Sequence, residues 1–304
     1  MSITLFCCAL VFVSCSDKYE PEQISSNNEK IISEGCIPFD YIGEQHNAFL
    51  YAIGLEYKDT MNLYAELARK NMLDAEMQEH LAQKIINGLP MIEKKYKIFD
   101  VSDNMMNEYL ETGVAYLNMD SADNLFFDNE LGDVVVHILE NLETSPNLNI
   151  QRDIIRAKEL ELLKHATCSL DTCVVITLNV LEHSMMFWND AYENGNNPWH
   201  NYLSATDSLI LNVTFNTKSN FLQGIGRFFA RIKDKAVEAF KNIIKPNSSK
   251  IAKLAVVDAV MTGATLYGLA HSPLAANPGA VVGGALVSGV LTSVGCGILN
   301  WRTL

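Results

Sequence analysis

The 304-residue sequence has few cysteines and none of the short motifs that mark common enzymes. Seven cysteines in a chain of this length are too few for a disulfide scaffold. We find no glycine-rich phosphate loop, no Gly-x-Ser-x-Gly nucleophile elbow and no His-Glu-x-x-His metal motif. Alternation of polar and apolar residues, the pattern of a half-buried strand, is nearly absent outside residues 208–217. The sequence therefore predicts an all-α protein that is not an enzyme, with no catalytic residue, metal or cofactor.

Basic side chains are scarce as well. The chain has 23 Lys+Arg against 36 Asp+Glu, and this net charge of −13 argues against a nucleic-acid partner. The imbalance is uneven, because residues 1–217 carry a net charge of −20 and residues 218–304 carry +7. A basic segment beside an apolar one is attracted to anionic lipid headgroups. We therefore expect the second part to contact membranes, unless it simply packs on the acidic part.

An apolar run of eleven residues, Ile3–Val13, precedes Ser14 and Cys15. The run is too short to span a bilayer as a helix, but it has the length of a signal-peptide core. Residues 12–15 resemble the lipobox of a bacterial lipoprotein precursor. This resemblance implies a signal peptide at residues 1–14 and acylation of Cys15. The other interpretation of the run is a buried N-terminal strand or helix.

Residues 15–34 are polar and acidic, which predicts a flexible tether. Asp17, two residues after Cys15, resembles the surface-export signal of Bacteroidetes lipoproteins. The string Ile42-Gly43-x-x-His46-Asn47 resembles a motif of uncharacterised Bacteroidetes-type lipoproteins that end in a glycine-rich apolar tail. These resemblances imply a lipid-anchored protein of the cell envelope, at the outer membrane or the cell surface.

Residues 35–217 form the predicted acidic body, in which apolar residues recur at helical spacing. The first stripe contains Phe49 and Ile53, and we expect Gln45, His46 and Asn47 to cap the open amide groups of that helix, with a ligand role for His46 as the alternative. Residues 174–188 are apolar nearly all round, which predicts a central helix surrounded by others. We expect a bundle of six or seven helices with breaks at turn-forming residues: Asn87-Gly88, 100–103, Ser145-Pro146 and 194–198.

Three groups of residues in the body have the residue types of a metal or binding site, but none has the sequence spacing that is usual for such a site. His137 and Glu140 lie on one helical face, but no second Glu-x-x-His accompanies them. Trp199 lies in a short loop and is expected either to offer a stacking surface or to plug the edge of the core. The third group matches no common zinc finger, and its cysteines are equally a candidate disulfide: His165, Cys168, Cys173 and His183.

Residues 218–250 contain the predicted basic amphipathic helix. The segment Phe221–Pro246 places its apolar side chains on one stripe, whereas Arg227, Arg231 and Lys235 lie mainly outside that stripe. This composition is typical of a helix that lies in a membrane interface. The same pattern also fits a helix packed on the acidic body.

Residues 251–304 lack charged side chains between Asp258 and Arg302. Two apolar stretches, Leu254–Ala270 and Gly279–Leu299, are separated by turn-forming residues, which predicts a helical hairpin. At about 1.5 Å per residue the second helix is about 31 Å long, close to the hydrocarbon thickness of a bilayer. Asp258 and the many small residues make insertion into lipid marginal.

Small residues recur every four positions in this hairpin, including Gly263 in the first helix and Gly284 and Gly289 in the second. Such rows let helix backbones approach closely. They resemble the glycine-zipper tails of membrane-active bacterial peptides and bacteriocins. Three interpretations stay open: a hairpin that is tucked into the body and released by a trigger, one that associates with copies of itself, and one that is permanently buried.

The sequence as a whole predicts a non-enzymatic envelope lipoprotein of unknown ligand. Its expected partners are membrane lipid, through acylated Cys15 and the C-terminal hairpin, and further copies of the chain. The alternative is a secreted toxin-like or bacteriocin-like effector whose tail perturbs a neighbouring membrane. The residues expected to act in membrane contact or self-association are Arg227, Arg231, Lys235, Gly263, Gly284 and Gly289.

Overall fold

The computed structural model describes residues 39–117, 147–165, 169–207, 250–271 and 277–300. Within these ranges the chain forms nine α-helices and no strand, which confirms the predicted all-α fold. The helices are α3 (Asp40–Glu56), α4 (Lys58–Arg69), α5 (Ala75–Tyr96), α6 (Asp103–Leu117), α9 (Leu148–His165), α10 (Ser169–Glu193), α11 (His200–Thr206), α13 (Lys250–Ala270) and α14 (Pro278–Gly295), which continues as a π-helical turn, η3 (Cys296–Asn300).

Several predictions made from the sequence lie outside these residues. They are the acylation of Cys15, the basic helix at 218–250, the strand candidate at 208–217 and the pair His137 and Glu140. Arg227, Arg231 and Lys235 belong to that basic helix, so their predicted membrane contact stays a prediction.

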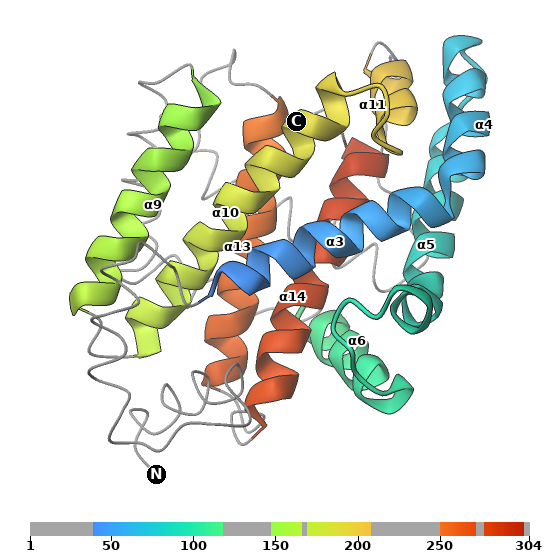
Figure 1. The fold of residues 1–304 in the computed structure, drawn as a ribbon. Coiled ribbons are helices and arrows are strands. Elements are labelled where there is room, and N and C mark those ends of the chain that lie inside the picture. The colour runs from blue at the N-terminus through green and yellow to red at the C-terminus, as the bar shows by residue number, and fades with distance from the viewer. Residues whose placement is uncertain (1–38, 118–146, 166–168, 208–249, 272–276, 301–304) are drawn as a thin grey trace.

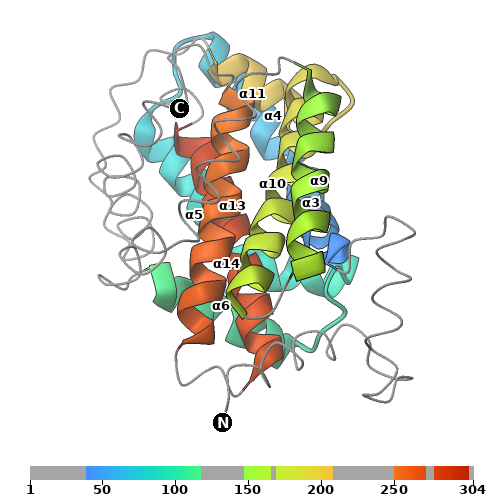
Figure 2. The same cartoon turned by 90° about the vertical axis from the view of Figure 1, so that its left-hand side faces the viewer.

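The C-terminal hairpin is part of the core of the bundle. Its first helix, α13, packs against α10 and α14, and α14 packs in turn against α6 and α3. α10 also contacts α3 and α9, so α9 forms an outer layer on α10 (Figure 1). Figure 2 shows α13 and α14 side by side, with α3, α9 and α10 on one side and α5 on the other. The short helix α11 packs on α4 at one end of the molecule.

α10 is the central helix that the apolar residues 174–188 predict. All residues from Thr172 to Glu182 are buried. Near its end the ring of Trp188 packs edge-on against the ring of Trp199, with 5.5 Å between their centroids. The indole Nε1 of Trp199 donates to the backbone oxygen of Leu50 at 2.8 Å. Trp199 therefore plugs the core and does not offer an open stacking surface.

The prediction that His46 caps the first helix is wrong. α3 begins at Asp40, so His46 lies well inside the helix, and it is fully buried. Phe39 occupies the N-cap position without a side-chain hydrogen bond. Gly43 marks the place where α3 crosses α10, because a Cβ atom there would lie 2.4 Å from the ring of His183. The motif around His46 thus serves packing between helices.

The expected break at Asn87-Gly88 is also wrong, because α5 runs without interruption from Ala75 to Tyr96. Gly88 makes room for the hydroxyl group of Tyr57, since a Cβ atom at Gly88 would lie 2.0 Å from that oxygen. The same hydroxyl donates to the backbone oxygen of Lys84 at 3.0 Å. The glycine therefore serves the contact between α5 and the end of α3, and it does not form a turn.

The hairpin has its ends where the turn-forming residues predict them. α13 ends at Ala270, and α14 begins at Pro278, whose missing N–H group costs nothing in the first turn of a helix. The side chain of Asn277 caps α14 by accepting a hydrogen bond from the backbone N–H of Ala280 at 3.3 Å.

Candidate functional site: a buried apolar hairpin and two polar clusters

The hairpin formed by α13 and α14 has the composition of a membrane segment but is covered by protein. Its second helix, over Gly279–Ile298, is long and apolar enough to cross a membrane, and the most apolar 18 residues of that stretch are 94% buried. The first helix contributes a shorter apolar stretch, Leu254–Ala270. In this conformation the hairpin provides the hydrophobic core on which α3, α6 and α10 pack.

The three glycines predicted to act in self-association all lie at helix contacts inside the molecule. A Cβ atom on Gly263 would lie 2.0 Å from Thr177 Oγ1 of α10, and one on Gly284 would lie 2.7 Å from Thr112 Cγ2 of α6. A Cβ atom on Gly289 would lie 2.1 Å from Thr262 Oγ1 within the hairpin. Association with another copy through these glycines would therefore require the hairpin to leave the body.

Asp258 lies within α13, the first helix of the hairpin, and is fully buried. Its Oδ2 accepts hydrogen bonds from the hydroxyl of Ser184 and, at 2.8 Å, from Nε1 of Trp188, both on α10. Its Oδ1 has no hydrogen-bond partner among the described residues. Burial raises the pKa of Asp258 to about 7, although contacts with Ser184, Ser293 and Trp188 oppose this shift.

His46 on α3 approaches the same place and is also fully buried. Its Nε2 lies 3.2 Å from Ser293 Oγ on α14 and 4.0 Å from Asp258 Oδ2, and its Nδ1 lies 3.2 Å from Asn47 Oδ1. Burial lowers the pKa of His46 to about 4; the contact with Asn47 opposes this shift and the charge of His183 adds to it. We call Asp258, His46, Ser184, Trp188 and Ser293 the core cluster.

The core cluster contains a serine, a histidine and an aspartate but lacks the geometry of a nucleophilic triad. In such a triad the carboxylate and the hydroxyl face opposite nitrogens of the imidazole ring. Here Ser293 and Asp258 both face Nε2 of His46. All three side chains are fully buried, so a substrate has no access to the hydroxyl in this conformation. The cluster acts instead as a polar link that joins the hairpin to α3 and α10.

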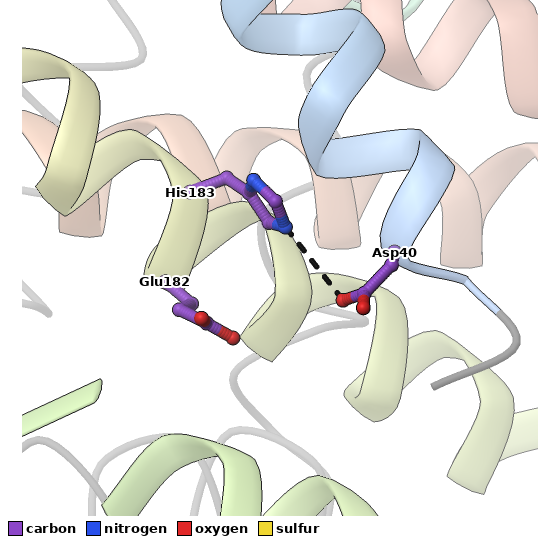
Figure 3. A group of neighbouring side chains, drawn as sticks. All are labelled: Asp40, Glu182 and His183. Atoms are coloured by element: carbon purple, nitrogen blue, oxygen red, sulfur yellow. Dashed lines mark ion pairs between the residues drawn. The ribbon is translucent and has the colours of Figure 1, made fainter. Parts of the chain in front are cut away.

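A second polar cluster lies where α3, α9 and α10 meet, and we call it the acidic cluster: Asp40, Glu159, Glu182 and His183. Figure 3 shows Asp40 of α3 facing His183 of α10, with Glu182 beside them. Asp40 Oδ1 lies 3.6 Å from His183 Nε2 and accepts a hydrogen bond from Asn179 Nδ2 at 2.9 Å. Burial alone would raise the pKa of Asp40, but His183, Arg156 and Asn179 outweigh it and hold that pKa below its usual value.

Two arginines of α9 neutralise part of this cluster. The Nε atoms of Arg152 and Arg156 both donate to Glu182 Oε1, at 2.6 and 2.7 Å. Glu159, also on α9, is fully buried and neither of its carboxyl oxygens has a hydrogen-bond partner among the described residues. Burial, together with the charges of Glu182 and Asp40, raises the pKa of Glu159 to about 9.

The zinc candidate made of His165, Cys168, Cys173 and His183 is not assembled in the residues that can be checked. Cys173 and His183 both lie on α10, ten residues apart, and a helix separates such positions by about 15 Å along its axis. His183 belongs to the acidic cluster instead. The proposed Cys168–Cys173 disulfide stays a prediction because Cys168 lies outside the described residues.

Comparisons with protein-family models, with curated proteins and with solved structures found no match to this chain.

Proposed function

We propose that this chain is a non-enzymatic, lipid-anchored protein of the cell envelope whose body covers a hairpin that becomes membrane-active on release. The observation that carries the proposal is an apolar helix of membrane-spanning length, Gly279–Ile298, held inside the body. The core of a helical bundle needs an apolar face on each helix. A helix that is apolar all round suits either the centre of a bundle or a bilayer, and the length of this one matches the thickness of a bilayer.

Hydrogen bonds within the hairpin support release, because they do not depend on the body. The hydroxyl groups of Thr262, Thr292 and Ser293 each donate to the backbone oxygen four residues earlier, at 2.8–2.9 Å. Thr265 donates to Ser288 Oγ across the two helices at 2.9 Å. Unpaired hydroxyl groups are costly in hydrocarbon, so bonds that travel with the hairpin lower the cost of transfer to lipid.

Asp258, in contrast, takes its hydrogen bonds from the body. Ser184 and Trp188 of α10 are its donors, and its second oxygen is buried without a partner. A buried unpaired polar group costs about 1–3 kcal/mol. Asp258 therefore both fixes the hairpin to α10 and weakens the closed conformation, as expected of a structure that can open.

A disulfide between the hairpin and the body would test release directly. Gly263 and Thr177 are suitable positions, because a Cβ atom at Gly263 would lie 3.1 Å from the Cβ of Thr177, just below the usual range of about 3.5–4.5 Å. In a full-length chain whose seven native cysteines are replaced by alanine, Gly263→Cys with Thr177→Cys should form this bridge. The oxidised protein should not release dye from anionic vesicles, and reduction should restore release.

The matched control joins the two helices of the hairpin to each other. A Cβ atom at Gly289 would lie 3.5 Å from the Cβ of Thr262, so Gly289→Cys with Thr262→Cys should also form a bridge. This protein should release dye in both redox states, because its hairpin can still leave the body. Equal dye release from oxidised and reduced Gly263→Cys/Thr177→Cys would contradict the proposal, as would no release from any of the reduced proteins between pH 4 and pH 8.

The lipid anchor is tested separately at Cys15. The Cys15→Ala variant should remain an uncleaved precursor that takes up no labelled palmitate, because the acyl acceptor is the thiol of that cysteine. Incorporation of label would be measured in cells that express the variant or the wild-type chain. Equal labelling of the two proteins would rule out acylation at this position.

A further inference from the structure

We propose that the acidic cluster is a binding site for a divalent transition-metal cation, with Asp40, Glu182 and His183 as ligands and Glu159 as an additional carboxylate. One ligand atom from each of the three proposed ligands lies within 4.8 Å of the other two. The three ligands come from α3 and α10, so a bound cation would join these two helices (Figure 3). Glu159, on α9, lies close enough for its charge to interact with those of Asp40 and Glu182. The sequence predicted no metal site here, because the ligands are far apart along the chain.

Atoms without hydrogen-bond partners are the observation that points to a missing ligand. Glu182 is 2% exposed and Glu159 is fully buried. Among the described residues, Glu182 Oε2 and both carboxyl oxygens of Glu159 have no hydrogen-bond partner, and His183 Nε2 has only the 3.6 Å contact with Asp40 Oδ1. Buried polar atoms in folded proteins are nearly always paired, and a group of unpaired ones indicates an ion or water that belongs there. These atoms include donors from an imidazole and two carboxylates, which together suit a metal cation.

The arginines of α9 do not pair with the unpaired carboxyl oxygen of Glu182. Arg152 and Arg156 direct their Nε atoms to Glu182 Oε1, on the other side of the carboxylate from the unpaired Oε2. Arg156 also lies 3.5 Å from Asp40 Oδ2. Two guanidinium groups thus face three carboxyl groups, those of Asp40, Glu159 and Glu182.

The donor set favours particular cations. Calcium and magnesium prefer sites made only of oxygen, whereas zinc and manganese accept imidazole together with carboxylates. Bonds of about 2.1 Å in a tetrahedral site hold the ligand atoms about 3.4 Å apart. The separation of up to 4.8 Å would therefore contract by up to about 1.4 Å on binding, which side-chain rotation can provide. We infer a site for Zn²⁺ or Mn²⁺ that is independent of whether the hairpin leaves the body.

Cation binding by the full chain tests this proposal. Equilibrium dialysis with Mn²⁺ should give one bound ion per chain, and Mn²⁺ or Zn²⁺ should raise the melting temperature, whereas Mg²⁺ should not. Mn²⁺ is the better probe because cysteine thiols elsewhere in the chain compete for Zn²⁺. No bound Mn²⁺ and no thermal shift in the wild-type protein would overturn the proposal and leave water as the occupant of the cluster.

Two variants and two controls make the test specific. His183→Gln and Glu159→Gln should each reduce the affinity for Mn²⁺ at least tenfold and abolish the thermal shift. Without metal, Glu159→Gln should fold and be at least as stable as the wild-type protein near neutral pH, because burial raises the pKa of Glu159 to about 9 and glutamine needs no proton to be neutral. The controls, Glu161→Gln on α9 and His80→Gln on α5, change exposed residues and should bind normally. Equal binding by all four variants would overturn the assignment.

Discussion

The Asp258→Asn variant is expected to be more stable than the wild-type protein at pH 8 and equally stable at pH 4. Burial raises the pKa of Asp258 from 3.8 to about 7. Between pH 3.8 and about pH 7 the carboxyl group of Asp258 is therefore protonated in the folded protein and ionised in the unfolded chain. The contribution of Asp258 is therefore fully present below about pH 4 and is lost as the pH rises through 7. Asparagine avoids this loss, which amounts to roughly 4 kcal/mol at pH 8.

His46→Gln is expected to show the opposite pH dependence. Burial lowers the pKa of His46 from 6.5 to about 4, so its contribution is present above pH 6.5 and is lost as the pH falls through 4. Glutamine removes this loss, and the variant should gain roughly 3 kcal/mol over the wild type at pH 4 and nothing above pH 7. In the wild-type protein the two residues oppose each other between about pH 4 and 6.5.

Urea denaturation at pH 4, 6 and 8 measures both effects as differences from the wild-type free energy of unfolding. Differences from the wild type are needed because other groups, Glu159 among them, also have different pKa values in the folded and unfolded states. Asp153→Asn changes an exposed aspartate on α9 and serves as the control. A less stable Asp258→Asn at pH 8 would contradict the raised pKa of Asp258 and indicate a stabilising ion pair with His46.

Gly289→Leu is expected to destabilise the fold by about 2 kcal/mol. The first carbon of any side chain at this position would lie 2.1 Å from Thr262 Oγ1 and 3.6 Å from the backbone oxygen of Asp258. Separating two packed helices costs about 1–3 kcal/mol even for small increases in volume. The gain in helix propensity of Leu over Gly is only about 1 kcal/mol, so the packing cost should dominate.

Two comparisons separate packing from propensity. Gly279→Ala, in the first turn of the same helix, places its Cβ in ordinary contact at 3.7 Å and should stabilise the protein slightly. The double variant Gly289→Ala/Thr262→Ala should recover stability lost in Gly289→Ala, because it removes the hydroxyl that the new methyl group meets. Thermal melts that place Gly289→Leu level with the wild type would rule out close packing at this row.

Features with local causes could be predicted from the sequence. The helical class, the buried stripe with Phe49 and Ile53, and the central position of residues 174–188 all follow from the spacing of apolar side chains. The ends of the hairpin follow from Pro278 and the cap of Asn277. Prediction failed at Gly88, where a glycine that usually marks a turn instead makes room for Tyr57 within a continuous helix.

The two polar clusters could not be assembled from the sequence. His46 and Ser293 are 247 residues apart, and Asp40 and Asn179 are 139 residues apart. A signal was present, since Asn179, Glu182 and His183 interrupt an otherwise apolar helix and buried polar groups need partners. That signal indicates that a partner exists, but it does not identify the partner.

The sequence by itself determined that the chain is helical and that its C-terminal hairpin is apolar enough to enter either a protein core or a bilayer. These properties depend on the spacing and the transfer free energies of residues that are near one another in the chain. Only the tertiary structure decided that the hairpin is enclosed by α3, α6 and α10, with Asp258 held by Ser184 and Trp188. The physical reason is that burial and hydrogen bonding depend on which helices meet. The hydrophobic effect is non-directional, so an apolar helix face does not determine whether another helix or lipid covers it.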